Sequence, residues 1–155
     1  MAIHFVPVRK ANYLECIDLS VDDTQTRYVA PNVFSLVQAA YEPDMYPLAI
    51  YSNETMVGFI LYDLDAELGA WSMSRFMIDK KHQGEGLGRQ ALNAFLDYFF
   101  LTHDVSELYT SVEIDNAVAL GLYESIGFQR QETFEYDACG EHYIEIRLLY
   151  NRETA

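Results

Sequence analysis

The sequence predicts an α/β protein with a mixed, mostly antiparallel sheet of about seven strands, flanked by about four helices. Alternating apolar patterns, typical of strands, recur along the chain and form pairs joined by polar turns. Four stretches of helical apolar spacing lie between these strand patterns, and two of them follow each other directly. The chain has 155 residues, half of them apolar, which suits one hydrophobic core. We therefore expect a single domain over residues 1–155.

The first half of the chain predicts one strand, two helices and a pair of strands. Ile3 to Val8 alternate between apolar and polar side chains, as a strand does. Helical spacing follows over residues 11–20 and again over residues 30–42, where Pro31 is a start signal. The next two strands lie on either side of residues 52–54, whose small polar side chains predict a turn.

The second half predicts a strand–helix–strand–helix core and a final pair of strands. A strand over residues 70–79 ends at a glycine-rich loop, and a helix follows from Arg89 to Thr102. Residues 107–114 form the next strand pattern, and residues 116–127 form a helix whose natural stop is Gly127. The last two strands fill residues 128–150 and turn at the sequence DACG.

The composition excludes several kinds of partner. A formal net charge of −14 repels nucleic acid and anionic lipid surfaces and attracts cations, although acidity also serves solubility alone. No run approaches the roughly 18 apolar residues of a membrane span, and the N-terminus lacks a signal-peptide pattern. The histidines form no i, i+4 pair and the two cysteines lie far apart. We expect a soluble, cytoplasmic protein with no nucleic acid, membrane or metal partner.

The glycine-rich loop QGEGLG predicts an anion site. It follows a strand and opens a helix, where free backbone N–H groups and the positive end of the helix dipole favour a phosphate. Four of the ten basic residues, Arg75, Lys80, Lys81 and Arg89, lie in this stretch. The dinucleotide pattern GxGxxG would need glycine at Arg89, and no Walker loop occurs. The alternative is a strand-to-helix turn without a ligand.

Two stretches together resemble a known family. RFMIDKKHQGEGLGRQAL is similar to motif A of the GCN5-related N-acetyltransferases (GNAT), and DNAVALGLYESIGF is similar to their N-x-x-A-x-x-L-Y-x-x-x-G-F segment. The two stretches occur in the family's order and at its usual separation. The resemblance implies a GNAT fold with a splayed central pair of strands, and acetyl-CoA or coenzyme A as the co-substrate.

The resemblance also implies a site. The backbone of a central strand would pair with the pantetheine arm like an added strand, loop amides would bind the pyrophosphate, Asn116 would hydrogen-bond the arm, and Tyr123 would be the general acid that protonates the departing thiolate. Packing is the alternative role for this tyrosine. The implied coenzyme-binding residues are Phe76, Met77, Ile78, Gln83, Gly84, Glu85, Gly86, Leu87, Gly88, Arg89 and Asn116.

The sequence does not decide which group accepts the proton of the attacking amine. An alkylamine has a pKa near 10, so it must lose a proton before it attacks. Many relatives place a glutamate on the strand before the loop, at the position of Ser74 here. Glu113 on the following strand is one candidate, and a water relayed through Ser74 or a tyrosine is another. A solvated or structural role for Glu113 is the alternative.

Within the family, the chain most resembles the bacterial spermine/spermidine N-acetyltransferases. This resemblance implies transfer of an acetyl group from acetyl-CoA to a primary amine of a polyamine, directly and within a ternary complex. A small polycationic amine fits the acidic charge of the chain. The alternatives are acetylation of a protein N-terminus, an amino acid or a drug, and a regulatory module that binds coenzyme A with little turnover. A homodimer is common in acetyltransferases of this type.

Overall fold

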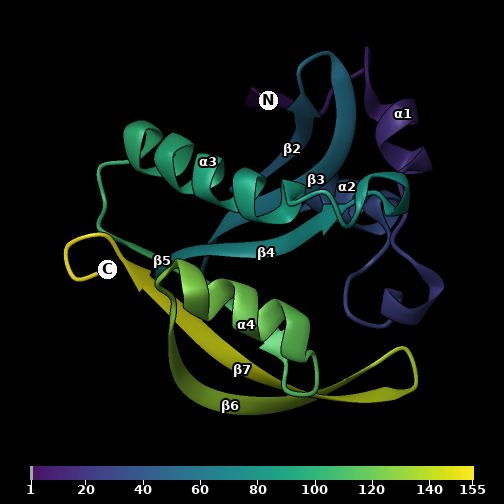
Figure 1. Cartoon of the computed structure of the whole chain (residues 1–155). Helices are drawn as coiled ribbons and strands as arrows, with labels where there is room; N and C mark the ends of the chain where they lie inside the picture. Colours follow the sequence, from purple (N-terminus) through teal and green to yellow (C-terminus); the bar gives the residue numbers. More distant parts are fainter. Residues whose placement is uncertain (1) are drawn as a thin grey trace.

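The computed structural model describes residues 2–155, and its elements follow the predicted order (Figure 1). The strands and helices are β1 (Ile3–Pro7), α1 (Tyr13–Asp18), α2 (Asn32–Tyr41), β2 (Met45–Ser52), β3 (Thr55–Asp65), β4 (Ala70–Ile78), α3 (Leu87–Thr102), β5 (Glu107–Glu113), α4 (Ala117–Ile126), β6 (Gln129–Ala138) and β7 (Glu141–Asn151). Short 3-10 turns occupy Asp23–Gln25 and Lys80–His82. The expected fold class, with seven strands and four helices, is confirmed.

All seven strands form one sheet in the order β1-β2-β3-β4-β5-β7-β6. Every neighbouring pair is antiparallel except β4 and β5, which are parallel. Only Ser72 and Tyr109 pair across β4 and β5, whereas the pairs on either side run along most of their strands. The two central strands therefore splay apart and leave the facing edge of each strand open. This is the splay that the family resemblance implies.

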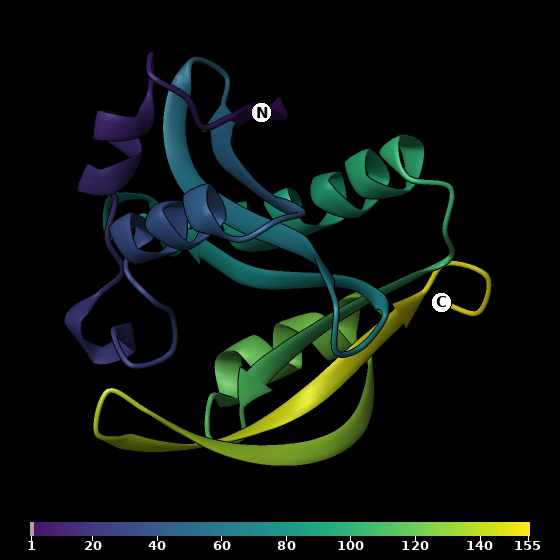
Figure 2. The ribbon, with the colours of Figure 1, turned by 180° about the vertical axis from the view of Figure 1, so that it is seen from behind.

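The helices cover the sheet unequally. Helices α3 and α4 lie on one face in Figure 1, and Figure 2 shows α1 and α2 on the other face, over the β2–β4 half. On the first face, α3 buries Leu92, Phe95, Leu96 and Phe99, the four residues that its spacing predicts for the core. On the second face, the β5–β7–β6 half carries no helix in Figure 2.

Helix α2 has the predicted extent but a different buried side. Its buried residues are Asn32 and Ser35, whereas Val33 and Val37, which supply part of its apolar spacing, are each about half exposed. Asn32 is held in the core because its side-chain amide donates to the Cys16 carbonyl at 2.9 Å. A polar anchor between α1 and α2 thus sets the helix rotation, which apolar spacing cannot reveal. Within residues 2–155, no helix combines the length and apolarity that a bilayer crossing requires.

Candidate active site

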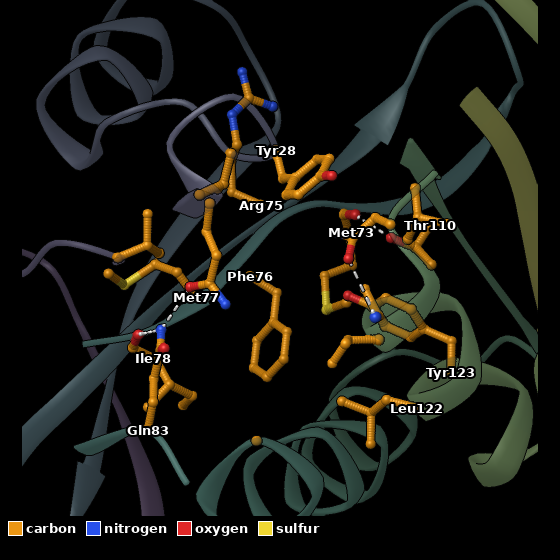
Figure 3. A pocket seen from close by; sticks show the side chains of 18 of the residues that line it. Tyr28, Met73, Arg75, Phe76, Met77, Ile78, Gln83, Thr110, Leu122 and Tyr123 are labelled. Atoms are coloured by element: carbon orange, nitrogen blue, oxygen red, sulfur yellow. Dashed lines mark hydrogen bonds between the residues drawn. The ribbon is translucent and has the colours of Figure 1, made fainter. Parts of the chain in front are cut away.

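A cavity of about 400 Å³ opens where β4 and β5 separate. Its walls come from β4, the glycine-rich loop, β5, the start of α4 and the segment between α1 and α2. In Figure 3, Phe76 projects into the middle of the cavity, and Tyr123 lies beside Thr110 and Met73. We refer to residues 76–88 with Asn116 as the glycine-loop side, and to Ser111, Glu113 and Glu145 as the carboxylate side.

The glycine-rich loop takes a conformation that glycine permits. Gly84 and Gly86 have φ values of +81° and +78°, a left-handed backbone that side chains with a Cβ rarely adopt. Gly86 is the N-cap of α3, and no side chain caps this helix end. The first backbone N–H groups of a helix have no partner within the helix. Those of α3 therefore remain available beside the cavity, which Gly86, Leu87 and Gly88 line.

The side chains of Gln83 and Glu85, both in the glycine-rich loop, have different contacts. The Gln83 amide donates to Gln25 Oε1 and to the Ile78 carbonyl, both at 2.9 Å, so it ties the loop to the α1–α2 segment and to β4. Glu85 is exposed and lies 3.8 Å from the His82 ring. Of the predicted coenzyme-binding residues, Glu85 and Arg89 are not among those that line the cavity, whereas the others are.

The four basic residues between Arg75 and Arg89 do not all lie at the glycine-rich loop. Lys80, Lys81 and Arg89 are exposed near it. Arg75 instead points toward Tyr28, away from the loop (Figure 3). Its guanidinium donates to the Ser74 carbonyl at 3.0 Å and to Gln38 of α2 at 3.1 Å. The Arg75 guanidinium is therefore held against α2 and is not one of the cations at the loop.

Strand β4 offers an edge for an extended ligand. Phe76, Met77 and Ile78 pair with β3 on one edge, and no β5 residue pairs with them on the other. An open strand edge can bind an extended chain as an added strand. The Ile78 carbonyl already accepts the Gln83 amide, and the Met77 carbonyl points toward Gly58 of β3, so the available edge groups are those of Phe76 and the Ile78 N–H. Asn116 caps α4, since its Oδ1 accepts the Ala119 N–H at 3.3 Å, and its side chain lines the cavity.

Tyr123 lies deep in the cavity wall with 5% of its surface exposed. Its phenol hydrogen-bonds the Thr110 hydroxyl, which donates its own proton to the Met73 carbonyl at 2.8 Å. Burial raises the pKa of Tyr123 above its ordinary value of 10.0, and the Thr110 bond lowers it by less. The phenol thus holds its proton at neutral pH. Nothing in its sequence context predicts Thr110 as this partner.

Two carboxylates face the cavity from neighbouring strands. Glu113 of β5 and Glu145 of β7 are opposite each other in the antiparallel register, and both line the cavity. Glu145 accepts the Ser111 hydroxyl at 2.7 Å and also the Tyr136 hydroxyl. Glu113 has one oxygen 3.1 Å from Arg27, while its Oε2 is buried without a hydrogen-bond partner. Burial is the largest effect on the pKa of Glu113, which is raised.

Such a pair is costly without a cation. Like charges directly opposite each other across two strands destabilise a sheet, and a buried carboxylate oxygen without a partner is also unfavourable. Arg27 compensates one oxygen of Glu113 only. The sequence shows Glu113 as an alternating strand residue, but Glu145 and Ser111 become part of the site only through the β5–β7 pairing. The carboxylate side is therefore suited to a cationic ligand.

Comparison with known proteins identifies the family of the chain. Residues 13–128 match the family model described as the acetyltransferase (GNAT) family. The spermine/spermidine N(1)-acetyltransferase of Bacillus subtilis is 30% identical over 135 residues, which cover 83% of this chain and 89% of that protein. The chain belongs to the GNAT acetyltransferase family. It is an N-acetyltransferase, with acetyl-CoA as the co-substrate.

Solved structures share the fold. The spermidine N-acetyltransferase of Vibrio cholerae, in complex with coenzyme A and spermine, superposes with a TM-score of 0.77 at 16% identity, over 98% of this chain and 96% of that one. The ribosomal-protein-S18-alanine N-acetyltransferase of Escherichia coli superposes with a TM-score of 0.71 at 19% identity, over 99% and 96% of the chains. At these sequence identities, the structural similarity establishes the fold and does not identify the acceptor.

Proposed function

We propose that the protein transfers the acetyl group of acetyl-CoA to a primary amine of a polyamine such as spermidine or spermine, by direct attack within a ternary complex. The observation that carries the proposal is the cross-strand pair Glu113 and Glu145, which places two carboxylates on one wall of the cavity. An acceptor with several ammonium groups supplies the positive charge that this wall lacks. The relatives named for spermine and spermidine support the same acceptor class.

The coenzyme is proposed to lie on the glycine-loop side. Uncapped amides at the start of α3, with those of Gln83 to Arg89, would bind the diphosphate. The open edge of β4 from Phe76 to Ile78 and the Asn116 side chain would bind the pantetheine arm. Glu85 and Arg89 do not line the cavity and are proposed to contribute only their backbone N–H groups. The thioester then comes to the splay point between β4 and β5.

Tyr123 is proposed as the general acid. When the amine attacks the thioester carbon, the carbon–sulfur bond breaks and a thiolate leaves, which a nearby hydroxyl can protonate. Thr110 holds the phenol at the splay point through its bond to Met73. Neither Cys16 nor Cys139 lines the cavity, so no thiol is placed there to form an acetyl-enzyme. Glu113, which lines the cavity and whose buried Oε2 has no hydrogen-bond partner, remains a candidate base.

Initial rates with a panel of acceptors test the proposal. Thiol release from acetyl-CoA is measured with spermidine, spermine, butylamine and a peptide with a free N-terminus. We expect the two polyamines to give the highest kcat/KM, and intersecting double-reciprocal plots as a ternary complex requires. Background thiol release with both polyamines, together with turnover of the peptide, would reject the polyamine assignment. Parallel plots would reject direct transfer.

The remaining expectations follow the family resemblance. We propose that residues 1–155 act as a single domain, that the protein works in the cytoplasm, and that it forms a homodimer. Limited proteolysis tests the first point, because one domain without internal linkers gives no stable fragment. Sedimentation velocity tests the third, with a mass of two 17.8 kDa chains as the expected result.

A further inference from the structure

Ser74 occupies a β-bulge at the cavity wall. Leu61 of β3 pairs with Arg75, and the next residue, Tyr62, pairs with Met73, so Ser74 is the extra residue of β4. A bulge bends its strand and re-aims a side chain, and bulges often lie beside active sites. Ser74 lines the cavity, and its hydroxyl donates a hydrogen bond to Asp63 Oδ2 on β3. The Ser74 hydroxyl thus connects the cavity wall to a buried carboxylate.

Asp63 is reached from the cavity through Ser74. It is 6% exposed and is not among the residues that line the cavity, whereas Ser74 is. Asp63 lies inside β3. The charged groups around it are Glu42 after α2, Asp65 on β3 and Arg75 on β4, and Arg75 in turn faces Tyr136 of β6 and Glu145 of β7. Burial is the largest effect on the pKa of Asp63 and raises it, while Ser74 and Arg75 lower it.

Hydrogen bonds fix the residues on both sides of the bulge, Met73 and Arg75. Arg75 donates to the Ser74 carbonyl and anchors to Gln38 of α2. On the preceding residue, the Met73 carbonyl accepts the Thr110 hydroxyl, the same group that holds the Tyr123 phenol. Ser74 is therefore one residue away from the carbonyl that fixes the proposed general acid. Ser74, which can take a proton from the amine, and Met73, whose carbonyl holds the contact to the Tyr123 phenol, are therefore adjacent residues of β4.

We propose that Ser74 and Asp63 form a proton relay that deprotonates the acceptor ammonium. This inference rests on the proposed function, because it concerns the amine of that reaction. An N–H bond of the ammonium breaks and its proton passes to Ser74 Oγ, while the Ser74 O–H proton passes to the Asp63 carboxylate. The neutral amine then attacks the thioester carbon and the carbon–sulfur bond breaks. The second proton that the nitrogen loses replaces the one that Tyr123 gives to the thiolate. Asp63 returns its proton to water, which accounts for the one proton that acetylation of an ammonium releases.

Ser74 is the residue that touches the amine, and Asp63 acts through it. Glu113 is the competing acceptor of the proton, and it differs from Asp63 in the group that it contacts. One of its oxygens is ion-paired with Arg27 at 3.1 Å, whereas the contact of Asp63 is the Ser74 hydroxyl, which lines the cavity. The two routes predict different pH profiles for single variants.

The pH dependence of the transfer rate tests the relay. Asp63→Asn keeps an oxygen that can accept the Ser74 hydroxyl but cannot take a proton, and Ser74→Ala removes the connection. In both variants we expect kcat at pH 7 to fall by about 10²-fold, as loss of general-base catalysis predicts. Their rates should then rise about tenfold per pH unit toward the amine pKa near 10, whereas the wild-type rate levels off at lower pH. Asp97→Asn, an exposed carboxyl on α3, is the matched control and should keep the wild-type profile.

The outcomes separate the two proposals. Wild-type profiles in both Asp63→Asn and Ser74→Ala would overturn the relay, and a profile altered only by Glu113→Gln would assign the base to Glu113. A wild-type enzyme that acetylates no alkylamine would overturn the proposed function together with the relay. In the coenzyme-free protein, ¹³C NMR of the side-chain carboxyls gives a readout independent of activity. Asp63 should titrate above the ordinary carboxyl range, and a carboxyl that titrates at or below that range would contradict the relay.

Discussion

The two sides of the cavity are built in opposite ways. The glycine-loop side comes almost entirely from one continuous stretch, from the end of β4 through the loop to the start of α3. The carboxylate side combines β5 and β7 with Arg27 before α2 and Tyr136 on β6. The first side presents backbone groups without partners, whereas the second presents side chains that already bind one another. This difference suits a constant diphosphate on one side and a variable amine on the other.

The contrast has a physical basis. A helix start offers N–H groups whatever its side chains are, so a short glycine-containing motif is enough to make an anion site. A cation site needs carboxylates at a defined separation, and these come from strands that meet only in the folded sheet.

Tyr123→Phe acts at the meeting point and should have the largest effect. We expect the transfer rate to fall by about 10²-fold or more, because the departing thiolate loses its proton donor. Coenzyme A affinity, measured by calorimetry, should stay nearly unchanged, since the phenyl ring keeps its packing against Phe128. Unchanged turnover would remove Tyr123 from the mechanism. Tyr98→Phe on α3 is the control hydroxyl, which does not line the cavity.

Loss of the carboxylate pair should affect the acceptor alone. For Glu113→Gln and Glu145→Gln we expect KM for spermidine to rise about tenfold each, or about 1.4 kcal/mol of binding. The salt dependence of kcat/KM should also weaken, because fewer charges attract the substrate. The KM for acetyl-CoA should stay the same. Equal losses for spermidine and butylamine would show that the pair does not recognise the additional charges of a polyamine.

Gly86→Ala should affect the coenzyme alone. The φ of +78° at Gly86 costs alanine about 1–2 kcal/mol, although the nearest side-chain atom lies 4.0 Å from an added Cβ. If part of this strain shifts the loop, coenzyme A affinity falls about fivefold, or 1 kcal/mol, while butylamine and spermidine keep their relative rates. Gly121→Ala, within α4, is the control and should raise the melting temperature. Affinity equal to wild type would show that the loop amides do not bind the coenzyme.

The smallest effect concerns stability. Because burial raises the folded-state pKa of Asp63, the ionised carboxylate opposes folding. This penalty is absent at acid pH and develops as pH rises from the unfolded value of 3.8 through the folded-state pKa. The melting temperature of Asp63→Asn should therefore gain on that of the wild type as pH rises, by about 2–4 °C for each kcal/mol. A constant difference across this range would contradict the buried, ionisable role of Asp63.

The sequence could predict the fold and the glycine-loop side because both depend on residues that are close together in the sequence. Strand alternation, helical spacing and the QGEGLG loop each lie within a short stretch, and the observed order of elements confirms them. The rotation of α2 is different, since it depends on the Asn32 bond to Cys16, a contact between two helices. The opposition of Glu113 and Glu145 depends on strand register, and the Ser74–Asp63 contact depends on a bulge. Such features arise from tertiary pairing, which single-residue patterns do not encode.

The ratio of kcat/KM for spermidine to that for butylamine tests the central claim most directly, because the two amines share a reacting group and differ in charge. If the carboxylate side selects a polycation, the wild-type ratio should be about 10² and should fall toward one in the Glu113→Gln/Glu145→Gln double variant. A wild-type ratio near one, or a ratio that the double variant leaves unchanged, would contradict the account.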